Sequence, residues 1–560
     1  MATSTEGEGP AARTRRGRAL DLAAVRLLRL PRSDHDYTVT RGVRVPMRDG
    51  VDLLADVYAP VGQSRGTLLL RTPYGRTGSV ALLTARYFAT HGYLVVNQSC
   101  RGTAGSGGEF KPFRDDVDDG ADTVAWLRTQ AWFDGRFALC GTSYLGATAW
   151  ALMTDPPPEL AAAVITTSAH DTHWVTHGAG AFSLAGTVSL LDGLDHLDSG
   201  AAAGLLRLVT AGRRLRPVFE ELPLTRAGER VLGAGGQTYR EWLTASDAHD
   251  PLWRPMRLGR ALDRVNVPVL LLEGWQDQSV AQMIQEYDHL RRRGVDVALT
   301  IGPWTHVQAA TRGAPILMGE TLDWLAEHLA GVSRRQRPSP VRIFITGAGE
   351  WRHLPTWPPH TTEEVLYLLP GGGLGHSPPG AHSPASTFRY DPADPTPAVG
   401  GRVINPAVAG SRDNRKLEAR DDVLTFTSPP MSEPLEVLGD PVIELVHHTD
   451  NPCADLFVRI CEVTANGSSL NVSDGFQRLS PEKSSGSISI RLDALAHRFN
   501  PGTRIRVQVS GGAHPRYARN LGTQEDPATG TTLVPSHRSI SHGAGGFSRL
   551  LLPVSATNAG

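Results

Sequence analysis

Three short segments place a serine, an aspartate and a histidine directly after apolar, strand-like runs. Ser143 lies in a Gly-Thr-Ser-Tyr-Leu-Gly turn, Asp277 in a Gly-Trp-Gln-Asp loop, and His306 in a Gly-Pro-Trp-Thr-His loop. A serine hydroxyl is a weak nucleophile at neutral pH, so it needs an imidazole to accept its proton and a carboxylate to hold that imidazole in the right tautomer. These residues predict an acyl-transfer site with Ser143 as nucleophile, His306 as general base and acid, and Asp277 as the orienting carboxylate.

The turn around Ser143 is flanked by glycines at positions 141 and 146. A strand, a tight turn and a helix in this order lift the serine hydroxyl above the sheet edge, and they aim the backbone N–H of Tyr144 at a developing oxyanion. In the common G-x-S-x-G form the second glycine comes one residue earlier, where this chain has Leu145. Taken alone, the segment is also compatible with a plain chain reversal in which Ser143 is a helix N-cap residue.

The other two segments favour the catalytic interpretation. Residues 267–273 and 296–301 are the kind of apolar run that is buried in a parallel sheet, and Asp277 and His306 follow their carboxyl ends, where such sheets place their sites. The chain order of serine, aspartate and histidine is the one that α/β-hydrolases use.

The chain resembles the family of α/β-hydrolase serine hydrolases that includes bacterial cocaine esterase, glutaryl acylases and X-prolyl dipeptidyl peptidases. The resemblance runs from about residue 37 to the C-terminus. It rests on an opening hairpin, an oxyanion tyrosine segment, a glycine-rich loop and two segments of a C-terminal β domain. These are residues 45–60, 72–74, 101–110, 420–424 and 514–520, respectively.

The resemblance implies that the Tyr74 hydroxyl donates to the oxyanion beside the N–H of Tyr144. Residues 68–72 read as a strand and Pro73 ends its pairing, which leaves Tyr74 in a loop at the same sheet edge. The alternative is that Tyr74 only packs, which is the commoner role of a tyrosine after a proline. The chain departs from the family at Ser99, where an aspartate is common, and at residues 278–279, Gln-Ser, where Gly and an aromatic residue are frequent.

Alternating strand and helix patterns in residues 37–170 and 255–335 predict the two parts of an α/β-hydrolase domain with a mostly parallel sheet. Between them, residues 171–254 lose the strand pattern, and helices are expected at 202–215 and 239–245. This insertion predicts a helical cap over the site.

Residues 1–36 are predicted to form a flexible tail and a short helix. Residues 336–560 contain short alternating strands between Pro/Gly/Ser-rich loops, which predicts an all-β sandwich, and the family resemblance implies a jelly roll. Trp174, Phe182 and Trp275 are candidates for the walls of the acyl or leaving-group pocket, with ordinary aromatic packing as the alternative.

Composition narrows the choice of partners. The chain of 560 residues has a formal net charge of −1, so it has no field that would attract nucleic acid or an anionic membrane, and it has no apolar stretch of the roughly 20 residues that a membrane span needs. Its four cysteines are too scattered for a disulfide framework, which favours a cytoplasmic location. His173 and His177 share a helical spacing but lack the zincin glutamate, so neither a metal nor another cofactor is expected. A homo-oligomer is compatible with the sequence.

We interpret the chain as a serine hydrolase that cleaves ester or amide bonds of small acyl substrates through an acyl-enzyme intermediate. Its partner would be a small-molecule ester, an amide or a short peptide. An X-Pro dipeptidyl peptidase is the first alternative, and it would need an acidic group to hold the α-ammonium of its substrate, whereas residues 307–311 are uncharged. An inactive hydrolase fold that only binds ligands is the second.

Overall fold

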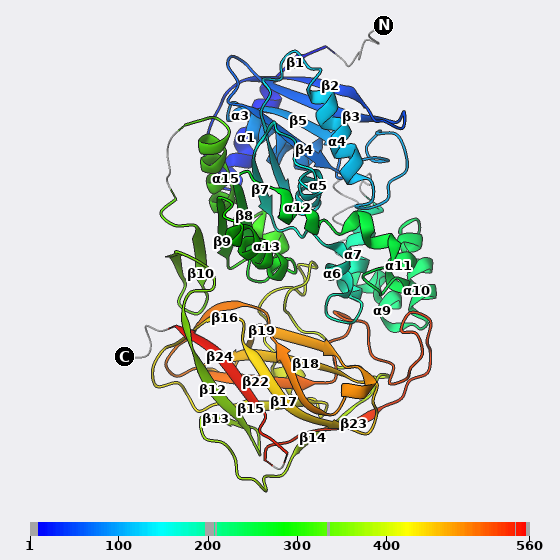
Figure 1. The fold of residues 1–560 in the computed structure, drawn as a ribbon, viewed down its shortest axis with the longest axis vertical. Coiled ribbons are helices and arrows are strands. Elements are labelled where there is room, and N and C mark those ends of the chain that lie inside the picture. Colours follow the sequence, from blue (N-terminus) through cyan, green and yellow to red (C-terminus); the bar gives the residue numbers. More distant parts are fainter. Residues whose placement is uncertain (1–8, 197–206, 208–209, 333–336, 544, 556–560) are drawn as a thin grey trace.

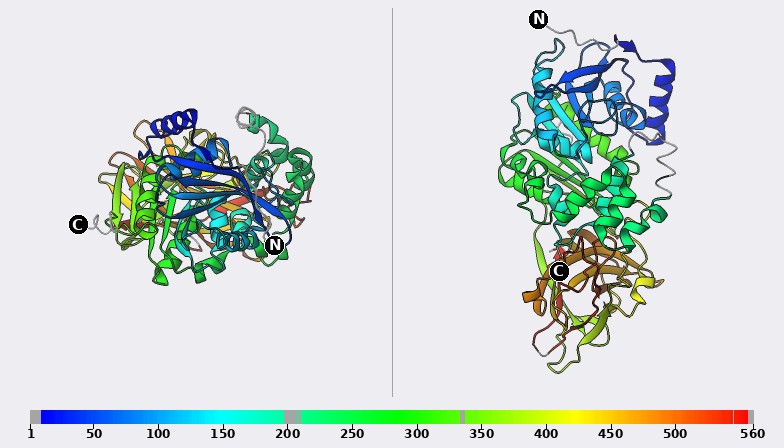
Figure 2. Two further views of the ribbon diagram at one scale, coloured as in Figure 1. Left: turned by 90° about the horizontal axis from the view of Figure 1, so that it is seen from above. Right: turned by 90° about the vertical axis from the view of Figure 1, so that its right-hand side faces the viewer.

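The computed structural model describes residues 9–196, 207, 210–332, 337–543 and 545–555. An α/β domain and an all-β domain lie end to end along the longest axis, and a group of helices lies beside their junction (Figure 1). In the right-hand view of Figure 2 the N-terminal strands and the β domain again lie at opposite ends. The predicted fold class is confirmed.

The α/β domain is built on an 11-stranded mixed sheet with the strand order β1-β2-β3-β5-β4-β6-β7-β8-β9-β10-β11. From β5 to β10 in that order neighbouring strands are parallel, and antiparallel pairs complete both edges. Strands such as β8 are buried along their whole length, as expected of parallel strands covered on both faces. The strands are β1 (Ala11–Ala12), β2 (Tyr37–Pro46), β3 (Asp52–Pro60), β4 (Thr67–Thr72), β5 (Leu94–Ser99), β6 (Phe137–Thr142), β7 (Leu160–Thr166), β8 (Val269–Gly274), β9 (Val297–Gly302), β10 (Val341–Ile345) and β11 (Glu350–Leu354).

Helices cover both faces of this sheet, and each face has its own apolar core. The helices of one face are α4 (Asp116–Leu127), α5 (Tyr144–Leu152), α12 (Gly259–Arg264) and α13 (Val280–Arg292). Those of the other are α1 (Arg15–Leu27), α3 (Ala85–Thr90) and α15 (Ala314–His328), next to the short α2 (Gly78–Leu83).

A helical segment lies between β7 and β8 and has a separate apolar core. Its described elements are α6 (Thr172–His177), α7 (Leu184–Leu194), α9 (Arg216–Glu220), α10 (Leu224–Leu232), α11 (Gly235–Thr244) and the 3-10 helix η1 (Pro251–Met256). The helix expected at 239–245 largely coincides with α11, and the one expected at 202–215 falls partly outside the described residues. We call this segment, residues 171–256, the cap.

The all-β domain packs its strands around a further apolar core of its own, and its loops reach the α/β domain. The Arg402 guanidinium donates from Nε to the carbonyl of Trp275 at 2.9 Å and ion-pairs with Asp493, so a buried β-domain residue holds the loop that carries Asp277. The strands are β12 (Thr361–Leu369), β13 (Gly373–Gly375), β14 (Ser386–Tyr390), β15 (Val423–Thr427), β16 (Leu435–Gly439), β17 (Val442–Thr449), β18 (Asp455–Val463), β19 (Ser469–Arg478), β20 (Gly486–Arg491), β21 (Leu495–Phe499), β22 (Arg504–Ser510), β23 (Ser536–Ile540) and β24 (Arg549–Ser555); the domain also holds the helices α16 (Arg415–Glu418) and η2 (Pro481–Lys483).

The N-terminal segment is tied to the α/β domain from its first described residues. Strand β1 pairs with β2, and Asp21 of α1 is buried between the guanidinium groups of Arg13, at 2.9 Å, and Arg86, at 2.7 Å. The predicted flexible tail begins in residues 1–8, which lie outside the described residues. Within the described part of the chain, no helix has the length and apolar character that a membrane crossing requires.

Candidate active site

Ser143 lies between β6 and α5 in a backbone conformation that few non-glycine residues adopt, with φ 58° and ψ −122°. Its neighbours must be glycines, because a Cβ at Gly141 would lie 2.2 Å from the carbonyl oxygen of Leu145 and one at Gly146 would lie 2.5 Å from the Cβ of Ser168. The turn thus needs glycine at position 146, one residue later than in the common motif.

The loops that carry Asp277 and His306 start at the same level of the sheet, because Gly274 at the end of β8 pairs with Gly302 at the end of β9. The N–H of Trp275 donates to the carbonyl of Gly302 at 2.8 Å, which holds the two loops together. A Cβ at Gly274 would lie 2.3 Å from the carbonyl oxygen of Trp304, so glycine is required where the loops approach.

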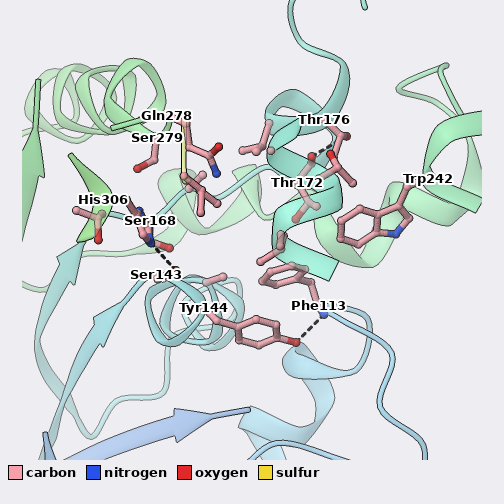
Figure 3. A pocket seen from close by; sticks show the side chains of 18 residues that line it. Phe113, Ser143, Tyr144, Ser168, Thr172, Thr176, Trp242, Gln278, Ser279 and His306 are labelled. Carbon is pink, nitrogen blue, oxygen red and sulfur yellow. Dashed lines mark hydrogen bonds between the residues drawn. The ribbon is translucent and has the colours of Figure 1, made fainter. Parts of the chain in front are cut away.

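These loops bring the three predicted side chains into one hydrogen-bonded chain. His306 Nδ1 lies 2.7 Å from Asp277 Oδ2. His306 Nε2 lies 3.0 Å from Ser143 Oγ, the contact that Figure 3 marks with a dashed line. Asp277 is fully buried, whereas the His306 side chain is 18 % exposed, so the imidazole can be reached from the pocket. His306 begins the short helix α14 (His306–Ala309), and a capping box between Thr305 and Gln308 fixes that start.

The electrostatics of the pair suit a proton relay. Burial acts to lower the pKa of His306, but the charge and hydrogen bond of Asp277 outweigh it and raise that pKa above its ordinary value. Burial acts to raise the pKa of Asp277, and here His306 and the hydrogen bonds from Ser279 prevail, so the pKa is lowered and the carboxylate stays ionised. An ionised Asp277 fixes the proton on Nδ1 and leaves Nε2 free to accept the proton of Ser143.

Behind Asp277 lies a second buried carboxyl group that the sequence analysis did not single out. The Ser279 hydroxyl oxygen lies 2.9 Å from Asp277 Oδ1 and 2.7 Å from Glu273 Oε2. One hydroxyl has one proton to donate, so both contacts are hydrogen bonds only if Glu273 is protonated and donates to Ser279 while Ser279 donates to Asp277. Burial and the charge of Asp277 raise the pKa of Glu273 well above its ordinary value, which agrees with this assignment.

Tyr74 and Tyr144 lie beside the serine. Burial raises the pKa of the Tyr74 phenol by more than the neighbouring Ser143 hydroxyl and the Tyr144 backbone lower it, so the phenol is neutral at pH 7. Tyr144 is the first residue of α5, so its N–H has no partner within the helix. The Tyr144 ring points away, stacks on Phe113 at 4.1 Å between centroids, and accepts the N–H of Phe113 at its hydroxyl oxygen (Figure 3).

The pocket above Ser143 and His306 is small and uncharged. Its volume is about 70 Å³, and its walls come from the cap (Thr172, Thr176, Trp242), from Gln278 and Ser279 beside Asp277, and from Ile404 of the β domain. Figure 3 shows the cap residues across the pocket from Ser143. Among the described residues that line it, none is Asp, Glu, Lys or Arg. Sequence reasoning missed Thr172, Thr176 and Trp242, because no local pattern marks them.

The three aromatic residues expected in this pocket lie elsewhere. The Trp275 side chain is buried in the core, where its indole N–H donates to the carbonyl of Phe344 at 2.8 Å. Phe182 packs in the core of the cap against Tyr239. Trp174 lines a neighbouring cavity between the cap and the β domain, next to Asp474 and Arg516.

His173 and His177 stack on each other at 5.3 Å, but both bind backbone carbonyls. His173 Nε2 lies 3.0 Å from the carbonyl oxygen of Ser246, and His177 Nε2 lies 2.8 Å from that of Trp242. A search of the described residues finds no group of three or more His, Cys, Asp or Glu residues placed to hold a metal ion.

Comparison with known proteins fits this geometry. Residues 49–308 match the X-Pro dipeptidyl-peptidase (S15) family, and residues 333–551 match the X-Pro dipeptidyl-peptidase C-terminal non-catalytic domain. The cocaine esterase of Rhodococcus sp. (strain MB1 Bresler) is 30 % identical over 546 residues, which cover 88 % of this chain and 93 % of the esterase. The chain belongs to this family of serine hydrolases. It is therefore a serine hydrolase that acts on ester or amide bonds.

Other relatives match this chain over most of its length. A putative serine esterase of Mycobacterium bovis is 23 % identical, with 86 % of this chain and 92 % of that protein covered. The solved structure of an α-amino acid ester hydrolase superposes with a TM-score of 0.78 at 25 % identity, covering 93 % of this chain and 97 % of that one. An aminopeptidase from a marine sediment Thaumarchaeota archaeon superposes equally well at 23 % identity and shows the same fold, with 94 % and 98 % covered.

Proposed function

We propose that the protein hydrolyses neutral esters or amides of small acyl groups, with Ser143 as nucleophile, His306 as general base and acid, and Asp277 as the orienting carboxylate. The observation that carries the proposal is the hydrogen-bonded chain from Ser143 Oγ through His306 to Asp277, which opens into a small pocket without charged walls.

In the first half-reaction Ser143 Oγ attacks the carbonyl carbon as its proton passes to His306 Nε2. The negative charge that develops on the carbonyl oxygen is stabilised by the Tyr74 hydroxyl and the Tyr144 N–H. His306 then donates the proton to the leaving alcohol or amine, which departs and leaves an acyl-Ser143 ester. Water, activated by His306, releases the acid in the second half-reaction and restores Ser143.

The walls of the pocket support a neutral acyl group. A free ammonium or carboxylate on the substrate would lose its hydration there without meeting an opposite charge, which costs several kcal/mol. The family match favours X-Pro dipeptidyl peptidase activity as the second candidate function. That activity needs a carboxylate near the scissile bond to hold the α-ammonium, and among the described residues the wall offers none.

The test is covalent labelling followed by a side-by-side assay. A fluorophosphonate probe is expected to label one serine, Ser143, and Ser143→Ala is expected to abolish both labelling and esterase activity. Ser168→Ala is the matched control, because Ser168 lines the same pocket without a bond to His306. Labelling that survives Ser143→Ala would contradict the nucleophile assignment and favour an inactive, ligand-binding fold. EDTA is expected to change nothing.

The same assay decides between the two substrates. p-Nitrophenyl acetate is expected to be hydrolysed with a kcat/KM far above that of Ala-Pro-p-nitroanilide, and the opposite order would establish the peptidase. A cytoplasmic location stays a prediction, and it is supported by the four cysteines, which are all free thiols. The formation of a homo-oligomer also stays a prediction.

A further inference from the structure

A second cavity reaches Ser143 from the opposite face of the sheet. Its volume is about 240 Å³, more than three times that of the pocket under the cap. It extends from Ser143 and Tyr74 between the sheet and the helices of the other face, and its far wall includes Leu28 and Leu30 at the end of α1 and Met318 of α15.

The lining of this cavity is hydrocarbon in character. None of the described residues that line it is charged. Two of its hydroxyl groups are engaged in their own helices, because Thr84 donates to the carbonyl of Val80 at 2.7 Å and Thr321 to that of Leu317 at 2.8 Å. The Cys140 thiol is buried and neutral, since burial raises its pKa. Cavities with such walls stay dry and bind apolar molecules; one of about 150 Å³ holds benzene.

The N-terminal segment forms part of the far wall of the cavity, through Leu28 and Leu30. Helix α1 ends at Leu27, and Arg29 takes a left-handed conformation with φ 54°, which turns Leu30 back under the helix so that its N–H donates to the carbonyl of Val25. Leu30 is 4 % exposed. The buried Asp21, paired with Arg13 and Arg86, anchors the helix in this position.

The path from the reacting bond into the cavity follows helix α14. His306 begins this helix, and Ala309 and Ala310, which line the cavity, come three and four residues later, on the same side of a helix. The leaving-group oxygen must lie at His306 Nε2 to receive its proton. At this end the cavity is lined by the small side chains of Ala309 and Ala310, whereas Tyr144 lines the small pocket on the cap side.

We propose that this cavity binds the aliphatic chain of the leaving alcohol or amine, of roughly six to ten carbons, while the small acyl group lies under the cap. This proposal rests on the proposed function, in which Ser143 is the nucleophile and His306 gives its proton to the leaving group. The preferred substrates of the protein are then alkyl esters or N-alkyl amides of short acids.

Two ester series separate the alcohol side from the acyl side. From ethyl to hexyl acetate, kcat/KM is expected to rise by at least about tenfold, since each buried methylene adds to binding. From methyl acetate to methyl hexanoate no comparable rise is expected. A rise in the second series alone would overturn the assignment to the leaving group, and a flat first series would overturn the site.

Filling the cavity tests its location. Ala314→Phe and, independently, Met318→Trp add bulk to the lining of the cavity on α15 and are expected to reduce the ratio of hexyl to ethyl acetate kcat/KM by about tenfold. Ala326→Phe on the same helix, outside the lining, is the matched control and is expected to leave the ratio unchanged. An equal ratio in wild type and both filled variants would contradict the proposal.

A binding measurement keeps this test separate from catalysis. Millimolar 1-hexanol is expected to raise the melting temperature of the Ser143→Ala protein, and to do so less in Ser143→Ala/Met318→Trp. If Ser143 labelling fails but 1-hexanol still binds, the proposed function is wrong and the site stands. If labelling succeeds and 1-hexanol changes the melting temperature of neither protein, the cavity proposal is wrong and the proposed function stands.

Discussion

The sheet edge and the cap meet at the same pocket but are built in different ways. Ser143, Asp277 and His306 each follow a strand of one sheet, and their loops are held by glycines that allow contacts as close as that between Gly274 and Trp304. The cap residues that face them come from helices with a core of their own. The proposed reactive groups thus lie at the ends of sheet strands, and the walls that face them lie on a separately packed insert. We therefore expect changes at the sheet edge to affect kcat and changes in the cap to affect KM.

The largest expected effect is that of Asp277→Asn. The amide keeps the shape of the side chain but favours the wrong imidazole tautomer, so kcat should fall by about 10⁴. Thr176→Val in the cap is the comparison, because it is nearly isosteric and its hydroxyl bonds only to its own helix, at Thr172 and His173. It is expected to change kcat/KM by no more than about tenfold. Steady-state kinetics on p-nitrophenyl acetate measure both, and similar losses in the two variants would break the distinction between edge and cap.

The second-largest expected effect is that of Tyr74→Phe. If the phenol donates to the oxyanion, its loss should lower kcat by roughly 10²–10³, about 2.7–4 kcal/mol, with KM little changed, because the bond strengthens as charge develops on the substrate. The ring and its packing against Tyr144 are retained, so the melting temperature should hold. A loss below about tenfold with unaltered stability would remove Tyr74 from the site.

The sequence predicts the sheet edge better than it predicts the walls of the pocket. The strand ends are recognisable because each apolar run and the polar residue after it are neighbours in the chain, and the fold class follows from the alternation of such runs. The walls are not recognisable, because Trp242 and Ile404 reach the pocket through long-range packing. Glu273 had a local signal, a carboxyl group at the end of an otherwise apolar strand, whereas the role of Leu28 and Leu30 becomes visible only once α1 is placed on the sheet.

Gly146→Ala tests the geometry of the edge through stability. The added methyl group would lie 2.5 Å from the Cβ of Ser168, which is expected to cost about 1–3 kcal/mol of unfolding free energy and to lower kcat by displacing Ser143. Gly259→Ala is the matched control, because a Cβ there meets nothing within 4 Å at the start of α12, so it should be neutral or slightly stabilising. Thermal and urea unfolding of the two variants give the comparison, and equal stabilities would show that the turn can relax.

The smallest expected effect is that of Glu273→Gln, and it tests whether the carboxyl group behind the triad is neutral. Glutamine can still accept the N–H of Gly274 through its oxygen and donate to Ser279 through its amide, as a protonated Glu273 does. We expect kcat/KM to stay within about threefold of wild type, less than about 0.7 kcal/mol.

The pH dependence of activity shows whether Glu273 is neutral or charged. Activity falls as the pH drops through the raised pKa of His306, because the imidazolium cannot accept the proton of Ser143, so the acid limb should lie above the ordinary histidine value of about 6.5. If Glu273 is neutral, Glu273→Gln leaves the limb in place. If it carried a charge, that charge would help to raise the pKa of His306, and its removal would move the limb to lower pH by about one unit. An unmoved limb together with near-normal kcat would assign the single negative charge of the buried pair to Asp277, the group that needs it.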